Sequence, residues 1–384
     1  MADLTELSRR MLDRAFQAKS VEEALAVLQQ CQDFRTFREI LMAADPLHRE
    51  EEALRACLID SLAAMHPQVQ RDSHRRKVSN WFSGTDRPRD KDLAFDLCMI
   101  LGLELPEANR LIMRICEESI HWRDPRDIVR AYAIVHHLTW GQTQALLARA
   151  QAQLSQALGT GTPQPASKPV MTSAVRQDVL DCLQESEEAL LAYLTQNAAV
   201  WGAFHNRAHA YFHTCLSLLR TGGSEPSSAQ DRKKRSRSES PAEDAQDRLT
   251  ADVILDAYFF RSLVQHAGPM TQVQKSVRSF WPDKTKLSLI STGGADVSRK
   301  ALIFLHLATC AEPEEAGRAQ TFRLMLKTLN LMLHQCGYQP LDPRNPFDWM
   351  IIFCLCVHDP DSRDERIQGV LRGLFPSPEG GSEK

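Results

Sequence analysis

Apolar residues recur along nearly the whole chain at spacings of three and four, which is the pattern of amphipathic helices. Residues 3–18 place Leu7 and Met11 on one face, and residues 48–65 repeat the pattern. The sequence Ser20-Val21-Glu22-Glu23 is a capping box that predicts the start of another helix. Alternating apolar and polar runs, which would indicate strands, are almost absent. The pattern therefore predicts an all-α protein.

Composition divides the chain into segments of two kinds. Residues 159–172 are rich in Gly, Pro, Ser and Thr, and residues 221–248 are polar, of mixed charge and low in complexity. The predicted organisation is an N-terminal helical domain over 1–158 that contains a helix-turn-helix module at about 50–111, a linker over 159–172, a helical connector over 173–220, a disordered loop over 221–248, a C-terminal helical module over 249–375 and a tail over 376–384.

One part of the sequence returns in a weaker form. The stretch from His74 to Leu103 is similar to the stretch that begins near residue 286, at an offset of 209 residues. The matched residues include Lys77 with Lys286, Gly84 with Gly293 and Lys91 with Lys300, and Asp124-Pro125-Arg126-Asp127 is echoed by Asp342-Pro343-Arg344-Asn345. The repeat predicts two diverged copies of one helical module.

Bulk properties restrict the class of protein. The chain has 384 residues and a net charge of -3, so contact with nucleic acid must come from a local basic patch. No run of 18 apolar residues is present, and the N-terminus has no apolar signal-peptide core, so no membrane partner is expected. The ten cysteines are scattered in apolar helical stretches, which is typical of buried thiols in a reducing cytoplasm.

The short helix predicted over residues 75–82 carries the strongest functional pattern. Val78, Trp81 and Phe82 are spaced to form its buried face, and polar residues point outward. Between Arg71 and Lys91 there are seven Lys or Arg and three Asp, a local excess of +4. The candidate DNA-binding residues are Arg75, Arg76, Ser79 and Asn80 for the bases, Arg71, Arg87, Arg89 and Lys91 for the phosphates, and Lys77 beside them.

Several of these residues form a longer motif. Val78-Ser79-Asn80-Trp81, Ser83-Gly84, Arg87-Pro88 and Leu97-x3-Leu101-Gly102-Leu103 follow one another in this region. The motif resembles the second half of the lambda-repressor-like (phage Cro/C1-type) helix-turn-helix family, in a subgroup common in Gram-positive gut bacteria that has a helical extension. The resemblance covers about 50–60 residues, and implies a five-helix DNA-binding domain that acts in transcriptional control. The segment from Pro67 to Ser73 lacks the family's Gln-x-x-Leu-Ala helix.

The second copy is expected to differ in function. Lys284, Lys286, Arg299 and Lys300 are candidates for a secondary nucleic-acid contact. However, the helix from Arg299 to Ala308 is apolar nearly all round, which is typical of a buried helix. This copy is therefore predicted to serve in packing, in a homodimer or in binding a protein partner.

Two further groups of residues each allow two interpretations. His205, His209 and His213 lie at helical spacing, where two could share a metal, but a helix face without metal is the simpler interpretation. The basic run at 232–237 could hold DNA non-specifically, or it is a solvated loop balanced by nearby acids.

The sequence as a whole favours a cytoplasmic, bacterial or phage-type DNA-binding regulator of transcription, whose partner is double-stranded DNA. The alternative is a helical interaction scaffold or adaptor that does not read DNA. No nucleotide-binding loop, hydrolase elbow or zinc-protease motif is present, so no enzyme activity, cofactor or metal is expected.

Overall fold

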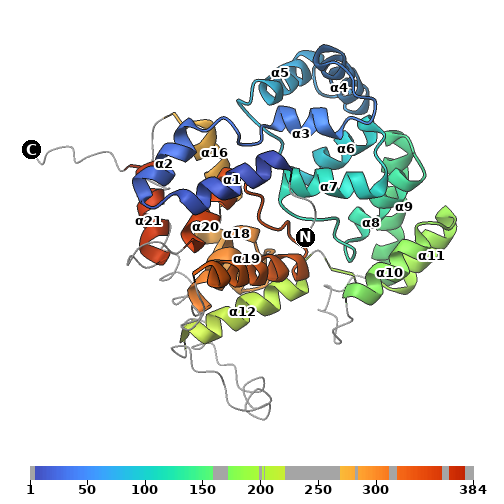
Figure 1. Ribbon diagram of the computed structural model, residues 1–384. Helices are drawn as coiled ribbons and strands as arrows, with labels where there is room; N and C mark the ends of the chain where they lie inside the picture. The colour runs from blue at the N-terminus through green and yellow to red at the C-terminus, as the bar shows by residue number, and fades with distance from the viewer. Residues whose placement is uncertain are drawn as a thin grey trace, which may run out of the picture. The chain divides into compact units, whose positions relative to one another are not determined.

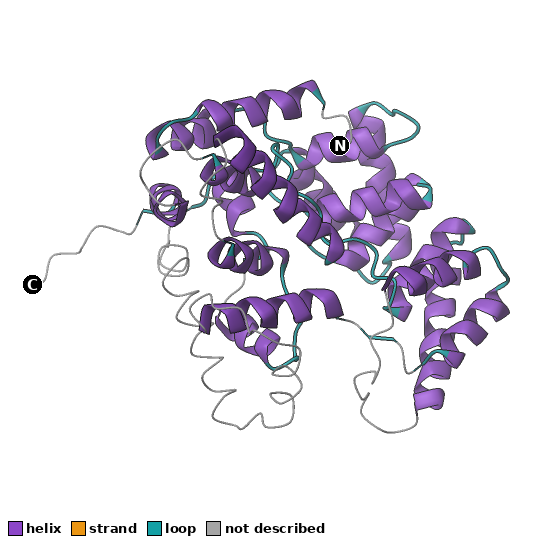
Figure 2. Ribbon diagram, turned by 60° about the horizontal axis from the view of Figure 1, so that its bottom comes forward, coloured by secondary structure: helices purple, strands orange, loops and turns teal. Residues whose placement is uncertain are grey.

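The computed structural model describes residues 5–158, 172–198, 201–202, 204–220, 269–281, 284–310, 318–356 and 363–376. Within these ranges every regular element is an α-helix (Figures 1 and 2), and the only extended pairing is a single bridge between Glu118 and Tyr338. The all-α prediction is confirmed. Among the described helices, none combines the length and the apolar character needed to cross a lipid bilayer.

The chain divides into two compact units. Unit 1 comprises residues 1–35, 205–336 and 340–384, and unit 2 comprises residues 36–204 and 337–339. The described helices of unit 1 are α1 (Glu6–Gln17), α2 (Val21–Gln30), α12 (Asn206–Arg220), α16 (Gln272–Arg278), α17 (Lys284–Ser291), α18 (Arg299–Thr309), α19 (Arg318–Gln335), α20 (Pro346–Leu355) and α21 (Arg363–Leu374). Those of unit 2 are α3 (Phe37–Ala44), α4 (Glu51–Met65), α5 (Arg71–Phe82), α6 (Lys91–Leu101), α7 (Leu105–Cys116), α8 (Pro125–Val135), α9 (Trp140–Leu158), α10 (Thr172–Cys182) and α11 (Glu187–Gln196).

This division differs from the predicted one at the N-terminus. Helices α1 and α2 belong to unit 1, where they pack on α20 and α21 (Figure 1). The reason is that every residue of α20 is buried, so a helix this apolar needs neighbours on all its sides. The indole Nε1 of Trp349 donates a hydrogen bond of 2.8 Å to the Met11 carbonyl, and Trp349 meets Phe34 edge to face.

The predicted helical connector over residues 173–220 is also divided. Helices α10 and α11 belong to unit 2, whereas α12 belongs to unit 1 and packs on α18. Residues 159–171 of the predicted linker, the loop over 221–248 with its basic run, and the tail from residue 377 lie outside the described residues.

Unit 2 has one continuous apolar core that positions α5. Phe37 of α3 meets Trp81 of α5 edge to face, with 5.8 Å between the ring centroids. Helix α4 packs along α5, and α6 packs on α7. Gly102 ends α6 in the left-handed region at φ 62°, where a glycine is favoured.

The same local hydrogen bonds occur in both units. In unit 2 the Asn109 side chain accepts from the Ile120 backbone, and Asp127 accepts from the His121 backbone, at 2.9 and 2.8 Å. The corresponding bonds in unit 1 join Asn330 to the Leu341 backbone at 2.8 Å and Asp348 to the Asp342 backbone at 2.9 Å. Each pair spans the same number of residues, and α8 and α20 both begin with a proline after an Asp or Asn cap. Asp124-Pro125 therefore lines up with Asn345-Pro346, and the sequence match to Asp342-Pro343 is wrong by three residues.

The helix starts do not follow the constant offset of 209 residues. Lys91 and Arg299 are the first residues of α6 and α18, so by position in the helix Lys91 lines up with Arg299 and not with Lys300. Gly84 and Gly293 occupy equivalent left-handed turns. The connection from the glycine to the next helix is therefore seven residues in one unit (91 − 84) and six in the other (299 − 293).

Candidate nucleic-acid interface

Helix α5 presents one apolar side to the core of unit 2. Val78, Trp81 and Phe82 are buried, as predicted, and His74 joins them with only 3% of its surface exposed. Burial lowers the pKa of His74 because the charged imidazolium would lose its hydration. The helix also starts at Arg71, four residues before the predicted start. These contacts fix α5 in orientation and leave its opposite side toward solvent.

The exposed side of α5 is mainly polar and basic. Arg75, Arg76, Lys77 and Asn80 are exposed, and Ser79 is half-buried. Residues three, four and seven apart share a helix face, so Arg76 and Ser79 lie along the middle of this side together with Asp72. We call Asp72, Arg75, Arg76, Ser79 and Asn80 the α5 ridge.

Two arginines at the start of α5 already have acidic neighbours. Arg71 pairs with Asp60 of α4, and Arg75 pairs with Asp72 at 2.7 Å. The hydrogen bond and charge of Asp60 raise the pKa of Arg71. All four side chains are more than half exposed. Exposed ion pairs of this kind contribute little to stability, so their arginines can exchange partners at small cost.

The basic residues after α5 do not all face solvent. Arg89 is exposed, but the Arg87 guanidinium is half-buried, 3.8 Å from the buried Glu117 carboxylate. Lys91 Nζ lies 2.7 Å from Asp127 and 3.3 Å from Glu118. Burial lowers the pKa of Lys91, but the two carboxylates outweigh it and raise the pKa overall. The prediction that Arg87 and Lys91 contact phosphates is thus unsupported, since both serve the fold.

A residue that the sequence analysis missed lies next to the α5 ridge. Arg55 of α4 lies over the Phe82 ring, 5.5 Å from its centroid, and its Nη2 is 3.4 Å from Ser79 Oγ. Its side chain is 37% exposed and pairs with Glu51 on the same helix. The sequence placed a helix there, but only the packing of α4 on α5 brings this guanidinium to the ridge.

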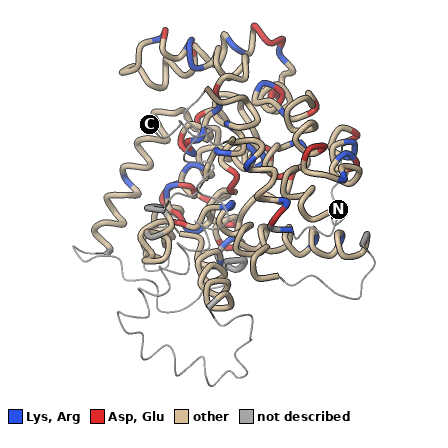
Figure 3. The backbone as a smooth tube through the Cα atoms, turned by 90° about the vertical axis from the view of Figure 1, so that its left-hand side faces the viewer, with Lys and Arg blue, Asp and Glu red and all other residues tan. Residues whose placement is uncertain are grey.

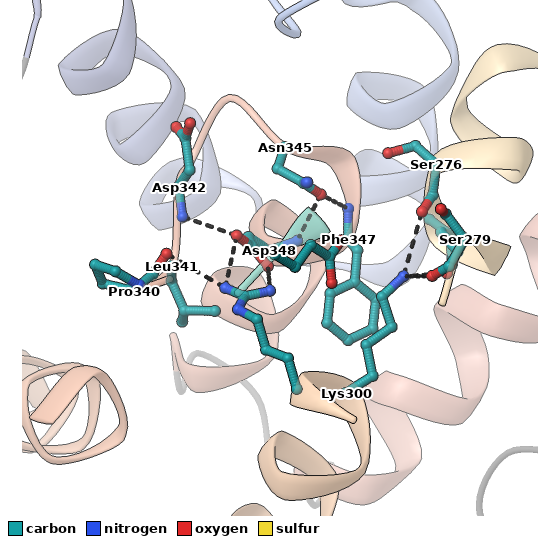
Figure 4. Close-up of polar contacts among 12 residues, drawn as sticks. Ser276, Ser279, Lys300, Pro340, Leu341, Asp342, Asn345, Phe347 and Asp348 are labelled. Carbon is teal, nitrogen blue, oxygen red and sulfur yellow. Dashed lines mark hydrogen bonds and ion pairs between the residues drawn. The ribbon is translucent and has the colours of Figure 1, made fainter. Parts of the chain in front are cut away.

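The candidate secondary contact in unit 1 is overturned for two of its residues. Arg299 is 3% exposed and makes two hydrogen bonds to Asp348, at 2.8 and 2.9 Å. Lys300 is fully buried and donates to the carbonyls of Ser276, Val277 and Ser279 at the end of α16 (Figure 4). Neither cation can reach a phosphate, because both complete buried hydrogen-bond networks. The side chains of Lys284 and Lys286 lie outside the described residues.

His205, which directly precedes α12, and His209 within it have a structural role. His205 Nδ1 and His209 Nε2 lie 2.5 and 3.2 Å from the Asp296 carboxylate, whereas His213 is exposed. Burial raises the pKa of Asp296, but its bonds to the two histidines prevail and lower the pKa. Asp296 thus ties the start of α12 to the loop before α18. No cluster of metal-ligating side chains occurs among the described residues.

The cysteines are all free thiols, and those at 98, 116, 215, 336, 354 and 356 are buried. Burial raises the pKa of Cys336 and of Cys356 to about 12, so both stay protonated near neutral pH. The prediction of buried thiols holds for this group, and none of them is primed for chemistry.

Charges of both signs are interspersed along the chain (Figure 3), so the α5 ridge is a local feature of an acidic protein. No family model, no curated protein and no solved structure matches this chain. The interface therefore has to be interpreted from its own geometry.

Proposed function

We propose that the protein is a DNA-binding regulator that reads double-stranded DNA with α5, with α4 beside it as the supporting helix. One observation carries the proposal: a short helix fixed by Val78, Trp81 and Phe82 turns a polar ridge that contains Arg75 and Arg76 to solvent. A recognition helix needs this combination, because it must be held rigidly while its free side enters the major groove. The helix-turn-helix resemblance supports the same proposal.

Residue roles follow from position along the ridge. Arg76 lies in its middle, where a guanidinium can bond a guanine through two donors, and Asn80 can bond an adenine. Arg71, Arg75, Lys77 and Arg89 are the exposed cations for phosphates. Asp72 is an acceptor within the ridge and can favour cytosine.

We also propose that the two units contain diverged copies of one module, and that only the copy in unit 2 kept the DNA-reading helix. The matched Asn and Asp bonds before α8 and α20 support this relation. A regulatory role in transcription is the expected use of such a reader.

Selection from a pool of random duplexes, followed by fluorescence anisotropy on the enriched duplex, tests the proposal. We expect Arg76→Ala to weaken binding to the enriched duplex by about tenfold or more, and to relax the preference at one base position. Affinity should fall with salt at a logarithmic slope of about −3, if three of the exposed cations meet phosphates.

The matched control is Arg110→Ala, which removes an exposed arginine of α7, in the same unit but on another helix. It should leave affinity and preference unchanged. Equal loss for Arg76→Ala on every sequence would assign Arg76 to the backbone only. If no duplex is enriched and binding has no salt slope, the proposal is wrong.

A second candidate function is an interaction scaffold that does not read DNA. It is favoured by one observation in unit 1, the leucines that α19 leaves exposed. The same selection separates the two functions, since a scaffold enriches no duplex.

A further inference from the structure

Helix α19 leaves two large apolar side chains in solvent. Leu324 is 50% exposed and Leu331 is 51% exposed, although Phe322, Met325 and Leu329 of the same helix are buried. Few large apolar side chains in the described residues are this exposed. Seven residues make two helical turns, so the leucines lie on one face, about 10 Å apart. Exposed Thr328 lies between them, and Gln335 follows one turn later.

One flank of this leucine face is basic. Arg323, Lys327 and His334 are exposed, and on a helix of 3.6 residues per turn all three fall on the same side of the line through Leu324 and Leu331. The other side of that line leads to buried Thr321, Met325 and Met332. The sequence of α19, Arg318–Gln335, contains no Asp or Glu. We call Leu324, Leu331 and this flank the α19 face.

The spacing and the charge together describe a partner. Leucines seven residues apart form the seam of a two-helix coiled coil, and charges beside the seam select the partner helix. A complementary helix therefore has apolar residues at heptad spacing and acidic residues beside them. A second copy of α19 would bring another basic flank and no carboxylates, so charge disfavours that pairing.

We propose that the α19 face docks an acidic amphipathic helix of a partner protein. Its leucine side chains would supply the buried contact, and Arg323, Lys327 and His334 would choose an acidic flank over a basic one. This site is independent of the α5 ridge, so either one can fail without the other.

Fluorescence anisotropy with the full chain tests this site. The probe is a labelled helical peptide of about three heptads, with leucine at the seam and glutamate at the flanking positions. The comparison peptide has lysine in place of glutamate. We expect the acidic peptide to bind, the basic peptide not to bind, and binding to weaken toward about 0.5 M NaCl.

Three variants locate the binding. The double variant Leu324→Ala/Leu331→Ala should lose about tenfold or more in affinity for the acidic peptide, and Lys327→Glu should also weaken it. Leu47→Ala removes a leucine that is 69% exposed in unit 2, and it should bind like the wild type. All three variants change only exposed side chains, and circular dichroism will confirm that each variant is folded.

Several outcomes would overturn the proposal. These are equal binding of the acidic and basic peptides, undiminished binding by the double variant, and no binding of either peptide. Loss of duplex DNA binding, rather than of peptide binding, in Lys327→Glu would assign the flank to nucleic acid instead.

Discussion

The first residues of α6 and α18 each form an ion pair with an aspartate, but the two pairs differ in how far they are exposed to solvent. In unit 1, Arg299 and Asp348 are each 3% exposed and share two hydrogen bonds. In unit 2, Lys91 makes the equivalent pair with Asp127, but its side chain is 19% exposed and it also reaches Glu118. The comparison shows that a cation near a helix start can be held in ion pairs within its own unit, where it is not available to a ligand. In the proposed function, DNA binding by unit 2 depends on the preceding helix, α5, whose arginines at 75 and 76 are exposed.

Removing the acid of the unit 1 pair should give the largest effect. Asp348→Ala leaves the Arg299 guanidinium buried without its carboxylate and frees the Asp342 backbone N–H, so we expect a loss of about 4 kcal/mol of stability. Urea titration read by hydrogen exchange of α20 peptides measures unit 1 directly. Asp60→Ala, at an exposed pair, is the control and should leave the curve unchanged. A small loss for Asp348→Ala would mean that water enters the site.

The pH dependence of unit 1 should come next in size. Burial, with the charge of Arg363, lowers the pKa of His306 on α18 to about 4, from an ordinary value of 6.5. The unfolded chain therefore binds this proton more tightly than the folded one. Stability should be full above pH 6.5 and fall by roughly 3 kcal/mol as the pH drops from about 6.5 to about 4.

The variant His306→Gln keeps a polar group for the Tyr211 hydroxyl, which lies 2.5 Å from Nδ1 in the wild type. Urea titrations of both proteins at several pH values isolate the contribution of His306 from that of the carboxylates. The variant should show a flatter profile below pH 6.5. Identical profiles for the two proteins would show that His306 does not titrate with unfolding.

The smallest loss is expected at the unit 2 pair. Asp127→Ala removes one carboxylate from Lys91, but Glu118 and water remain within reach, so we expect about 2 kcal/mol. Hydrogen exchange of α8 peptides in urea reports this unit. A loss as large as that of Asp348→Ala would show that exposure does not explain the difference between the two pairs.

Sequence alone predicted the helices well, because the residues that begin and end a helix lie within a few positions of its ends. Ser20 caps α2 as expected, and the apolar helix that begins at Arg299 is buried over nearly its whole length. The all-α class follows from the same periodicity. The assignment of residues 1–35 to unit 1 was missed, because the partners of α1 and α2 are far away in sequence.

The candidate site was harder to predict, because exposure depends on neighbours. Arg76 and Lys300 are both basic residues next to other basic residues in the sequence, yet Arg76 is exposed and Lys300 is fully buried. A constant offset pairs Lys91 with Lys300, although the helix starts put Lys91 opposite Arg299, because an offset does not register a loop that is one residue shorter. Arg55 reaches the α5 ridge only through packing between helices, which local patterns do not specify.

The packing of α1 and α2 on α20 and α21 has a consequence for synthesis. Helices α1 and α2 pack on α20 and α21, which follow them by more than 300 residues in the chain. The carbonyl of Met11, for example, accepts a hydrogen bond from the indole of Trp349, which is synthesised much later. Most of unit 2 is contiguous in the chain, so it can fold while translation continues, whereas unit 1 cannot be completed until α20 and α21 have been made.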